Sequence, residues 1–185
     1  MAKLCCAIII WCVCSFMFSL PIDAQSGRAS EVVAQIRIRY TQAKEMINYN
    51  NTIPEAKNQL IVNGSFMCPA TGHRDEQIQY YFTSNYKEDV DRYVSIPYFI
   101  MRSYNVAARS FYEEFLYDEQ GTLIFSYCKN DNFEGGIDES RYYWDGDGQL
   151  VHTLIQGQPT TDDILASRLS ADLLEAFHRL MDREF

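Results

Sequence analysis

The sequence predicts an α+β protein, in which an antiparallel sheet lies between two helices along the chain. Near both ends of the chain apolar residues recur every three to four positions, which is typical of amphipathic helices. Between these segments apolar and polar residues alternate, which is typical of strands. The alternating segments follow one another through short turns and leave no room for the crossovers of a parallel sheet. We therefore expect a helix, an antiparallel meander of about six strands, and a second helix packed on the sheet.

The first helix is expected to begin at Ser30, whose hydroxyl can cap it, and to end near Tyr49. Its apolar stripe comprises Val32, Val33, Ile36, Tyr40, Ala43 and Ile47. Residues 51–76 have no clear period and contain two prolines and two glycines, so we expect a long loop there. Within this loop, residues 59–62 have the composition of a short strand.

Two strands are expected next, at residues 77–82 and 92–101, because apolar side chains alternate in both. Pro97 lies inside the second of them. Proline has no N–H group to donate to a neighbouring strand, so it favours an edge or a β-bulge at this point.

The clearest pattern in the chain is a repeated turn. Residues 117–124 match residues 144–151 in the order aromatic, Asp, two variable residues, Gly, polar, Leu, aliphatic. In each copy the Asp can accept hydrogen bonds from the turn backbone, and the Gly can adopt the positive φ that follows a type I turn. We therefore predict positive φ at Gly121 and Gly148. The two predicted hairpins pair residues 111–118 with 122–129 and residues 140–145 with 149–156.

These turns also predict the register of the two hairpins. Tyr117 is expected opposite Leu123, Phe115 opposite Phe125, Glu113 opposite Tyr127, Trp144 opposite Leu150 and Tyr142 opposite His152. This face is the more apolar of the two, so we expect it to face the core. The other face, which carries Tyr112, Glu114, Arg141 and Tyr143, is expected to be accessible.

The last helix is expected to be capped by Thr160 or Thr161, with Asp162 and Asp163 favourable at its positive end. Its apolar stripe comprises Ile164, Leu165, Leu169, Leu173, Phe177, Leu180 and Met181.

Residues 1–24 have the pattern of a cleaved signal peptide. Lys3 precedes an uncharged and mostly apolar run over residues 4–20, which Pro21 ends, and Ala24 offers a small residue for cleavage. The alternative is a membrane anchor, for which the run is at the lower limit of length. We expect a single secreted or periplasmic domain over residues 25–185, with no membrane span after cleavage.

The charge of the chain argues against nucleic acid as a partner. The 16 Lys and Arg residues are outnumbered by 25 Asp and Glu residues, which gives a net charge of −9. A nucleic-acid surface would need a basic face instead. The aromatic content of 14%, with 13 tyrosines, suits a recognition surface, although tyrosine is also a good strand residue.

Two cysteines remain after the predicted leader, Cys68 and Cys128. In an exported protein such a pair predicts a disulfide. The alternative is a functional site in the loop, with Cys68 as nucleophile or metal ligand and His73 as its partner.

Other candidate chemistry is sparse. The sequence has no phosphate-binding Gly-rich loop, nucleophile elbow or His-Glu-x-x-His motif. Glu113 and His152 share the predicted aromatic face, where they could act as acid and base in a small extracytoplasmic hydrolase. The acidic segment 131–147 could attract Ca²⁺ but lacks the spacing of an EF-hand loop. We therefore predict neither a metal site nor a cofactor.

The function that fits these observations is a non-catalytic module that binds a protein or a glycan. Its candidate binding residues are Tyr112, Glu114, Arg141 and Tyr143, because aromatic and charged side chains that lie side by side are typical of binding hot spots. The alternatives are the hydrolase and a structural protein of envelope assembly.

Residues 104–118 and 121–125, together with the hairpin that begins with Arg141, carry a family resemblance. In these segments the chain is similar to small exported proteins of unknown function from Bacteroides-type gut bacteria. The resemblance implies a periplasmic or surface setting and assigns no catalytic residue.

Overall fold

The computed structural model describes residues 22–53, 58–89 and 91–182. Residues 1–21 of the predicted leader lie outside this range. In chain order the elements are α1 (Ile22–Thr52), β1 (Gln59–Cys68), β2 (Gly72–Lys87), β3 (Arg92–Val106), β4 (Arg109–Tyr117), β5 (Leu123–Asp131), β6 (Ile137–Trp144), β7 (Leu150–Gln156) and α2 (Asp163–Met181).

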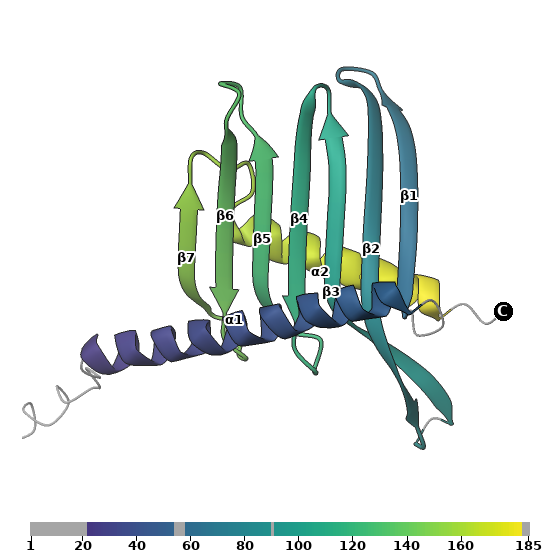
Figure 1. Cartoon of the computed structure of the whole chain (residues 1–185), viewed down its shortest axis with the longest axis vertical. Helices are drawn as coiled ribbons and strands as arrows, with labels where there is room; N and C mark the ends of the chain where they lie inside the picture. Colours follow the sequence, from purple (N-terminus) through teal and green to yellow (C-terminus); the bar gives the residue numbers. More distant parts are fainter. Residues whose placement is uncertain (1–21, 54–57, 90, 183–185) are drawn as a thin grey trace, which may run out of the picture.

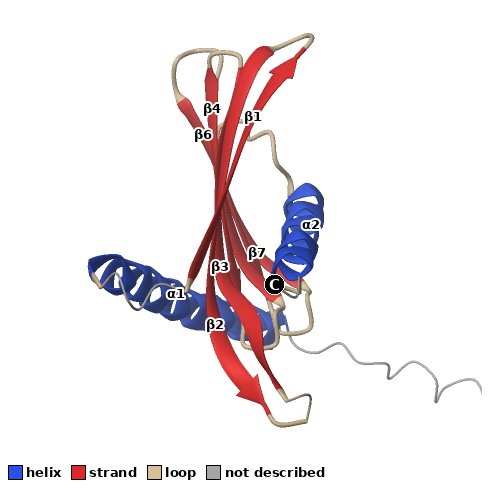
Figure 2. Ribbon diagram, turned by 90° about the vertical axis from the view of Figure 1, so that its right-hand side faces the viewer, coloured by secondary structure: helices blue, strands red, loops and turns tan. Residues whose placement is uncertain are grey.

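The strands form one antiparallel seven-stranded sheet in the order of the chain (Figure 1). α1 crosses one face of the sheet and α2 crosses the other, and the upper part of the sheet extends beyond both helices (Figure 2). We call these surfaces the α1 face and the α2 face. The predicted α+β class is confirmed, with one strand more than expected.

The additional strand lies in the segment that we expected to be a loop. Only residues 59–62 were predicted to be extended, but β1 continues to Cys68, and β2 begins at Gly72 rather than at residue 77. The expectation of a long loop is therefore wrong. In β1 the polar residues and Gly64 interrupt the alternation of apolar and polar side chains by which a strand is recognised. The strand is stabilised by its continuous pairing with β2. Local sequence does not encode such a partner.

The two repeated turns form as predicted. The φ angles of Gly121 and Gly148 are 81° and 74°. The side chains of Asp118 and Asp145 each accept hydrogen bonds from two backbone N–H groups of their turns. The pairs next to the turns, Tyr117 with Leu123 and Trp144 with Leu150, are also as predicted.

Beyond these pairs the predicted register is wrong by one residue in both hairpins. Phe115 lies opposite Ser126 and Glu113 opposite Cys128, while Tyr142 lies opposite Thr153. The cause is a β-bulge at the same place in each hairpin, where Ile124 and Val151 are additional residues without a directly opposite partner. Because a shift of one residue exchanges the faces, Phe125, Tyr127 and His152 do not share a face with Phe115.

Both faces of the sheet contribute buried residues to the core, rather than one aromatic face. On the α1 face the buried apolar residues are Val33, Ile36, Ala43, Ile47, Tyr81, Phe99, Leu116, Ile124, Phe125 and Tyr143. On the α2 face they are Tyr80, Ile100, Phe115, Tyr117, Tyr142, Trp144, Ala166, Leu173 and Phe177.

Pro97 lies at a β-bulge, as predicted. The pairing of β2 with β3 shifts between Tyr81 and Phe82, and Pro97 lies outside the stretch of β3 that pairs with β4. The end of β2, from Phe82 to Lys87, pairs with the start of β3, from Arg92 to Pro97. These segments form a two-stranded arm that projects from the sheet (Figure 1).

The last helix differs from the expectation at its first turn. The N-cap is Asp162, whose carboxylate accepts a hydrogen bond from the N–H of Leu165, rather than Thr160 or Thr161. Ile164 and Leu165 are exposed, and the buried stripe begins at Ala166. The carbonyl of Thr161 instead accepts hydrogen bonds from Tyr142 and Ser140 of the sheet, which fixes where the helix begins.

Candidate functional site

The four predicted binding residues lie on one face of the sheet, the α1 face. Tyr112 and Glu114 come from β4, and Arg141 and Tyr143 come from β6, with β5 between the two strands. The expectation that this face is accessible is wrong for two of them. Glu114 is 2% exposed and Tyr143 is 3% exposed, because α1 packs on the sheet at this point.

Glu114 joins α1 to the sheet. Its carboxylate accepts hydrogen bonds from the hydroxyl of Tyr40 at 2.6 Å and from the hydroxyl of Tyr112 at 2.5 Å, and it pairs with Lys44 Nζ at 2.8 Å. The pKa of both tyrosine hydroxyls is raised above the usual range of tyrosine. The larger cause is burial, and the second is the neighbouring Glu114 carboxylate. Both hydroxyls therefore stay protonated and keep donating. A buried carboxylate with three donors is a structural anchor rather than a free base.

A groove of about 440 Å³ runs between α1 and the sheet beside this anchor. It is lined by Ile36, Arg37, Tyr40, Thr41, Phe125, Tyr127, Arg141 and Tyr143. The guanidinium of Arg37 lies 5.8 Å from the ring centre of Tyr143, and that of Arg141 lies 5.0 Å from the ring centre of Tyr127. Two arginines therefore lie over tyrosine rings at the rim of one cavity.

Glu139 fixes the side chains at one end of this groove. It accepts hydrogen bonds from the Tyr127 hydroxyl and from Arg141, both at 2.8 Å. Burial and the neighbouring Glu139 raise the pKa of Tyr127 to about 12, so Tyr127 is a neutral donor at physiological pH.

Two further hollows on the α1 face adjoin the groove. One of about 510 Å³ is lined by Ser103, Ser110, Phe111, Tyr112, Tyr127, Lys129 and Asp131. It shares Tyr127 with the groove. The next hollow, of about 600 Å³, shares Ser103, Ser110 and Phe111 with the second. The three hollows follow one another along the α1 face, each sharing lining residues with the next, and we call this row of hollows the trough.

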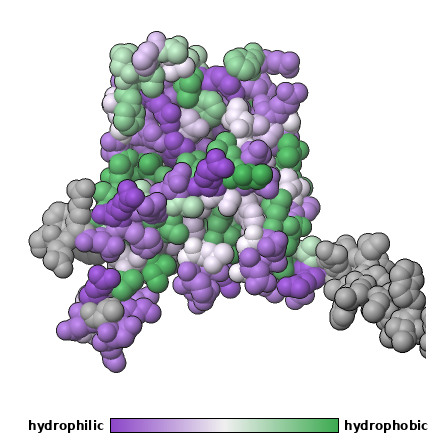
Figure 3. All heavy atoms as spheres, turned by 180° about the vertical axis from the view of Figure 1, so that it is seen from behind, coloured by the Kyte–Doolittle hydropathy of each residue, from purple (hydrophilic) through white to green (hydrophobic). Residues whose placement is uncertain are grey.

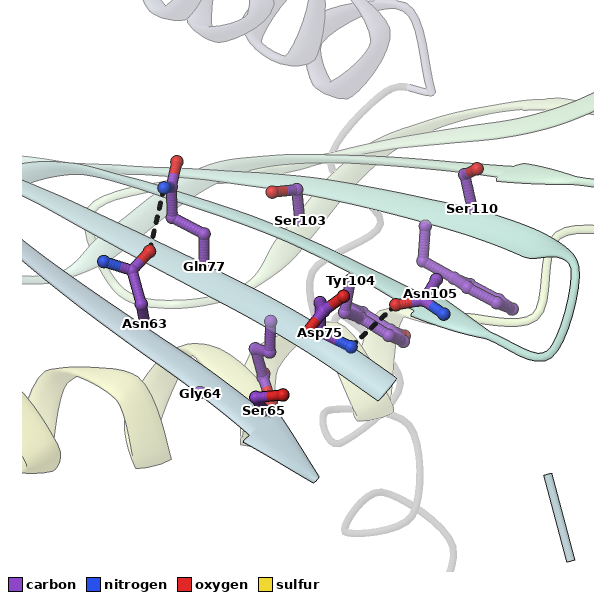
Figure 4. Close-up of a pocket in the computed structure, with 11 residues that line it drawn as sticks. Asn63, Gly64, Ser65, Asp75, Gln77, Ser103, Tyr104, Asn105 and Ser110 are labelled. Carbon is purple, nitrogen blue, oxygen red and sulfur yellow. Dashed lines mark hydrogen bonds between the residues drawn. The ribbon is translucent and has the colours of Figure 1, made fainter. Parts of the chain in front are cut away.

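The far end of the trough is rich in amides and hydroxyls (Figure 4). Gln77 donates to the side chain of Asn63 at 2.9 Å, and Asn105 accepts from the N–H of Asp75 at 2.7 Å. The side chains of Gln77, Ser103 and Ser110 project from the same side of their strands (Figure 4). The lining therefore changes along the trough, from tyrosine and arginine beside α1 to amides, hydroxyls and the carboxylate of Asp75 at the far end.

The α2 face carries a separate charged cluster. Arg102 pairs with Glu76 at 2.5 Å and with Glu113 at 3.0 Å, and Tyr104 donates to Glu113 at 3.4 Å. Burial raises the pKa of Glu113, and Arg102 opposes that shift. A cavity of about 460 Å³ lies between this cluster and the first half of α2.

The predicted acid and base, Glu113 and His152, are not brought together. Glu113 lies on the α2 face of β4, whereas His152 lies beside Tyr143 of the α1 face, on the edge strand β7. The β-bulge at Val151 is the reason, because it moves His152 to the other face. The sheet separates the two side chains, so this pair cannot form an active site.

The predicted pair of Cys68 and His73 is also not assembled. His73 lies opposite Met67, and Cys68 lies opposite Gly72, so the two side chains belong to opposite faces. His73 instead lies between Ser65 and Asp75, at 3.3 Å and 2.9 Å. Both contacts use Nε2, whereas a catalytic triad needs the serine and the acid on different ring nitrogens.

The predicted disulfide between Cys68 and Cys128 is wrong. Both thiols are free, and they lie on β1 and β5, four strand positions apart in the sheet. At about 4.8 Å per position the strands are roughly 19 Å apart, far beyond the reach of a disulfide. Burial raises the pKa of Cys128 to about 12.

Within the described ranges, no three His, Cys, Asp or Glu side chains lie close enough to hold a metal ion, and this includes the acidic segment 131–147. None of the described helices has a stretch that is long and apolar enough to span a membrane.

Sequence reasoning missed the contribution of α1 to the site. Arg37, Tyr40 and Lys44 follow one another at helical spacing, and Tyr40 was assigned only to the apolar stripe. A tyrosine hydroxyl on a buried stripe needs a polar partner, which was the available signal. Comparisons with protein-family models, with curated proteins and with solved structures find no match to this chain.

Proposed function

We propose that this chain is an exported, non-catalytic module that binds an oligosaccharide in the trough. The observation that carries the proposal is the row of three adjacent hollows, which share lining residues and offer tyrosine rings, arginines, amides and hydroxyls in succession. A long, shallow and chemically varied depression suits a chain of similar units better than a single small molecule.

The lining matches the chemistry of sugars. A pyranose ring has an apolar C–H face, which can stack on an aromatic ring, and a rim of hydroxyls that donate and accept hydrogen bonds. Tyr112 and Tyr127, with ring centres 6.3 Å apart, lie in the middle of the trough. Amides and hydroxyls such as those of Gln77 and Ser103 both donate and accept, as sugar hydroxyls require.

The charges favour neutral or mildly acidic sugars. Arg37 and Arg141 line the groove beside α1, whereas the acidic lining residues Asp75 and Asp131 belong to the other two hollows. An arginine can hold a carboxylate in a bidentate geometry, so an acidic sugar unit would lie beside α1. The chain as a whole carries a net charge of −9, which disfavours a polyanion. A uronic-acid unit among neutral sugars fits both features.

The carboxylates of the trough support binding rather than hydrolysis. Asp75 accepts a hydrogen bond from His73, and Asp131 accepts one from the backbone N–H of Ser110. The bond to Ser110 lowers the pKa of Asp131, whereas the acid of a glycosidase needs a raised pKa.

The first test is an array of neutral and uronic-acid oligosaccharides probed with the labelled chain, followed by calorimetric titration of the best ligand. We expect Tyr127→Ala and Arg141→Ala each to weaken binding by about tenfold or more, because they remove an aromatic ring and a guanidinium from the trough. The matched controls are Tyr93→Ala, on the projecting arm, and Arg168→Ala, on α2. Both are exposed and outside the trough, and should leave the affinity unchanged.

Two results would overturn the proposal. One is the absence of binding to every oligosaccharide, or an equal loss in trough and control variants. The other is release of sugar products by the wild-type chain that Asp75→Asn or Asp131→Asn abolishes, which would make the trough a hydrolytic site.

A further inference from the structure

β1 is an edge strand without the usual protection against pairing. Over its ten residues, Gln59–Cys68, it has no charged side chain and no proline, and its pairing with β2 has no β-bulge. Natural edge strands are normally kept apart by lysines, prolines or bulges, because their outer N–H and C=O groups can pair with another strand. None of the described elements lies beyond the outer side of β1 (Figure 1).

The sequence of β1 is symmetric in polarity about Gly64. Asn63 and Ser65 flank the glycine, and three apolar residues follow on each side, Leu60 to Val62 and Phe66 to Cys68. An antiparallel pair of two such strands, with Gly64 opposite Gly64, would place apolar against apolar and polar against polar throughout.

This register also agrees with the faces of the sheet. Residues that lie directly opposite each other in an antiparallel pair point to the same face. The pairing about Gly64 would bring Ile61 opposite Met67 on the α1 face and Val62 opposite Phe66 on the α2 face. Phe66 and Met67 are 50% and 77% exposed in the single chain, and pale green apolar atoms mark the β1–β2 corner at the upper left of Figure 3.

Gly64 fits the centre of such a pair. A Cβ atom at this position would lie 2.6 Å from the ring of Phe66, so the ring covers the glycine. Aromatic side chains commonly shield edge glycines in this way. Because Gly64 has no side chain, two copies of its backbone can lie opposite each other at the centre of the pair without a steric clash.

β1 is the more suitable of the two edge strands for contact between copies. Two copies with a net charge of −9 repel each other, which favours a contact between uncharged surfaces, and both edge strands lack Asp, Glu, Lys and Arg. The other edge strand, β7, is shorter, has the β-bulge at Val151 and places His152 next to its centre.

We propose that two copies of the chain pair through β1 in antiparallel orientation about Gly64, to give one continuous sheet. The two-fold axis is perpendicular to the sheet, so both α1 faces lie on the same side. Asn63 and Ser65 border the trough, so the two troughs would adjoin across the interface. This last consequence rests on the proposed function, whereas the pairing itself does not.

The test is the mass of the exported chain in solution, measured by sedimentation velocity between about 1 and 100 μM, a range that covers moderate dimer affinities. We expect the mass of a dimer. Ile61→Lys places a charge on the free edge and should weaken association by about tenfold or more. Ile155→Lys makes the same change on β7 and should leave the dimer intact. A monomer at all concentrations, or dissociation by Ile155→Lys alone, would overturn the proposal.

Crosslinking tests the register without relying on the charged variant. In the proposed register, Leu60 lies opposite Cys68 of the second copy, so Leu60→Cys should give a covalent dimer on mild oxidation through the native Cys68. Gln59→Cys, one position away and on the other face, should not. No crosslink in Leu60→Cys, or equal crosslinking in both variants, would contradict the register. Oligosaccharide binding by a monomeric variant would separate a failure of this pairing from a failure of the proposed function.

Discussion

Glu113 and Glu114 are neighbours in the sequence, yet β4 directs their carboxylates to opposite faces of the sheet. Glu114 holds α1 through Tyr40 and Lys44, and Glu113 lies in the arginine cluster beneath α2. Both are buried, and each has its own donors. Glu114 therefore ties β4 to α1, whereas Glu113 ties β4 to the neighbouring strand β3 on the opposite face.

Glu113 gives a prediction about pH. Burial raises the pKa of Glu113 in the folded chain above its unfolded value. Folding therefore favours the neutral acid, and the contribution of Glu113 to stability is present below the unfolded pKa and lost as the pH rises through the folded pKa. Glu113→Gln does not titrate. We expect its free energy of unfolding, relative to that of the wild type, to increase as the pH rises from about 4 to about 7.

Urea unfolding at a series of pH values measures this difference. Glu175→Gln is the control for the loss of a carboxylate, because Glu175 lies at an exposed position of α2, outside the Arg102 cluster, and pairs with the exposed Arg179. The free energy of unfolding of Glu113→Gln minus that of the wild type should rise with pH. If this difference stays constant or falls as the pH rises, the raised pKa of Glu113 would be contradicted.

At the scale of elements, the two repeated hairpins combine a turn with a β-bulge. Each has an Asp that holds the turn, a Gly with positive φ, and an additional residue three positions after that Gly. The bulge sets which side chains face α1 and which face α2. The repeat therefore determines the composition of both faces at this end of the sheet.

We expect Gly121→Ala and Gly148→Ala each to lower the free energy of unfolding by about 1 kcal/mol or more, because alanine disfavours positive φ. Gly146→Ala is the matched control. It lies in the second turn, its φ is not positive, and no atom lies within 4 Å of a Cβ built there. Chemical denaturation of the three variants measures the effect. A loss in Gly146→Ala as large as in Gly148→Ala would indicate general turn disruption instead.

The sequence was sufficient for features that depend on local chemistry. The existence of the two helices, the two turns and the bulge at Pro97 follow from spacing and from the backbone properties of single residues. The predicted start of the first helix at Ser30 is wrong, because α1 begins at Ile22 and the Ser30 hydroxyl donates to the carbonyl of Gly27 within the helix. β1 could not be predicted in full, since its pairing with β2 stabilises it. The bulges at Ile124 and Val151 were missed because both residues are ordinary strand formers. The site was predicted only in part. Its four predicted residues share a face, but Arg37 and Tyr40 reach that face from α1, more than 70 residues earlier in the chain than Glu114 and Arg141. Local sequence does not show which helix packs on which face.

At the scale of the molecule, the dimensions of the helices explain why a trough exists. α1 has 31 residues and is about 46 Å long, enough to cross seven strands that span about 29 Å. A helix is only about 10 Å wide, whereas the nine residues of β4 are about 30 Å long. One helix therefore covers a band of each face and leaves the rest to side chains that face solvent. On the α1 face these side chains line the trough (Figure 4).

The measurement that tests the central claim most directly is paramagnetic line broadening of backbone amides by a spin-labelled oligosaccharide, chosen from the array. If the ligand lies in the trough, amides of α1 near Thr41 and of β3 to β5 near Ser103 and Tyr127 should broaden strongly. Amides of α2 near Arg168, on the far side of the sheet, should keep their intensity. Strong broadening in α2 or in the β2–β3 arm, with the α1 face unaffected, would contradict the account.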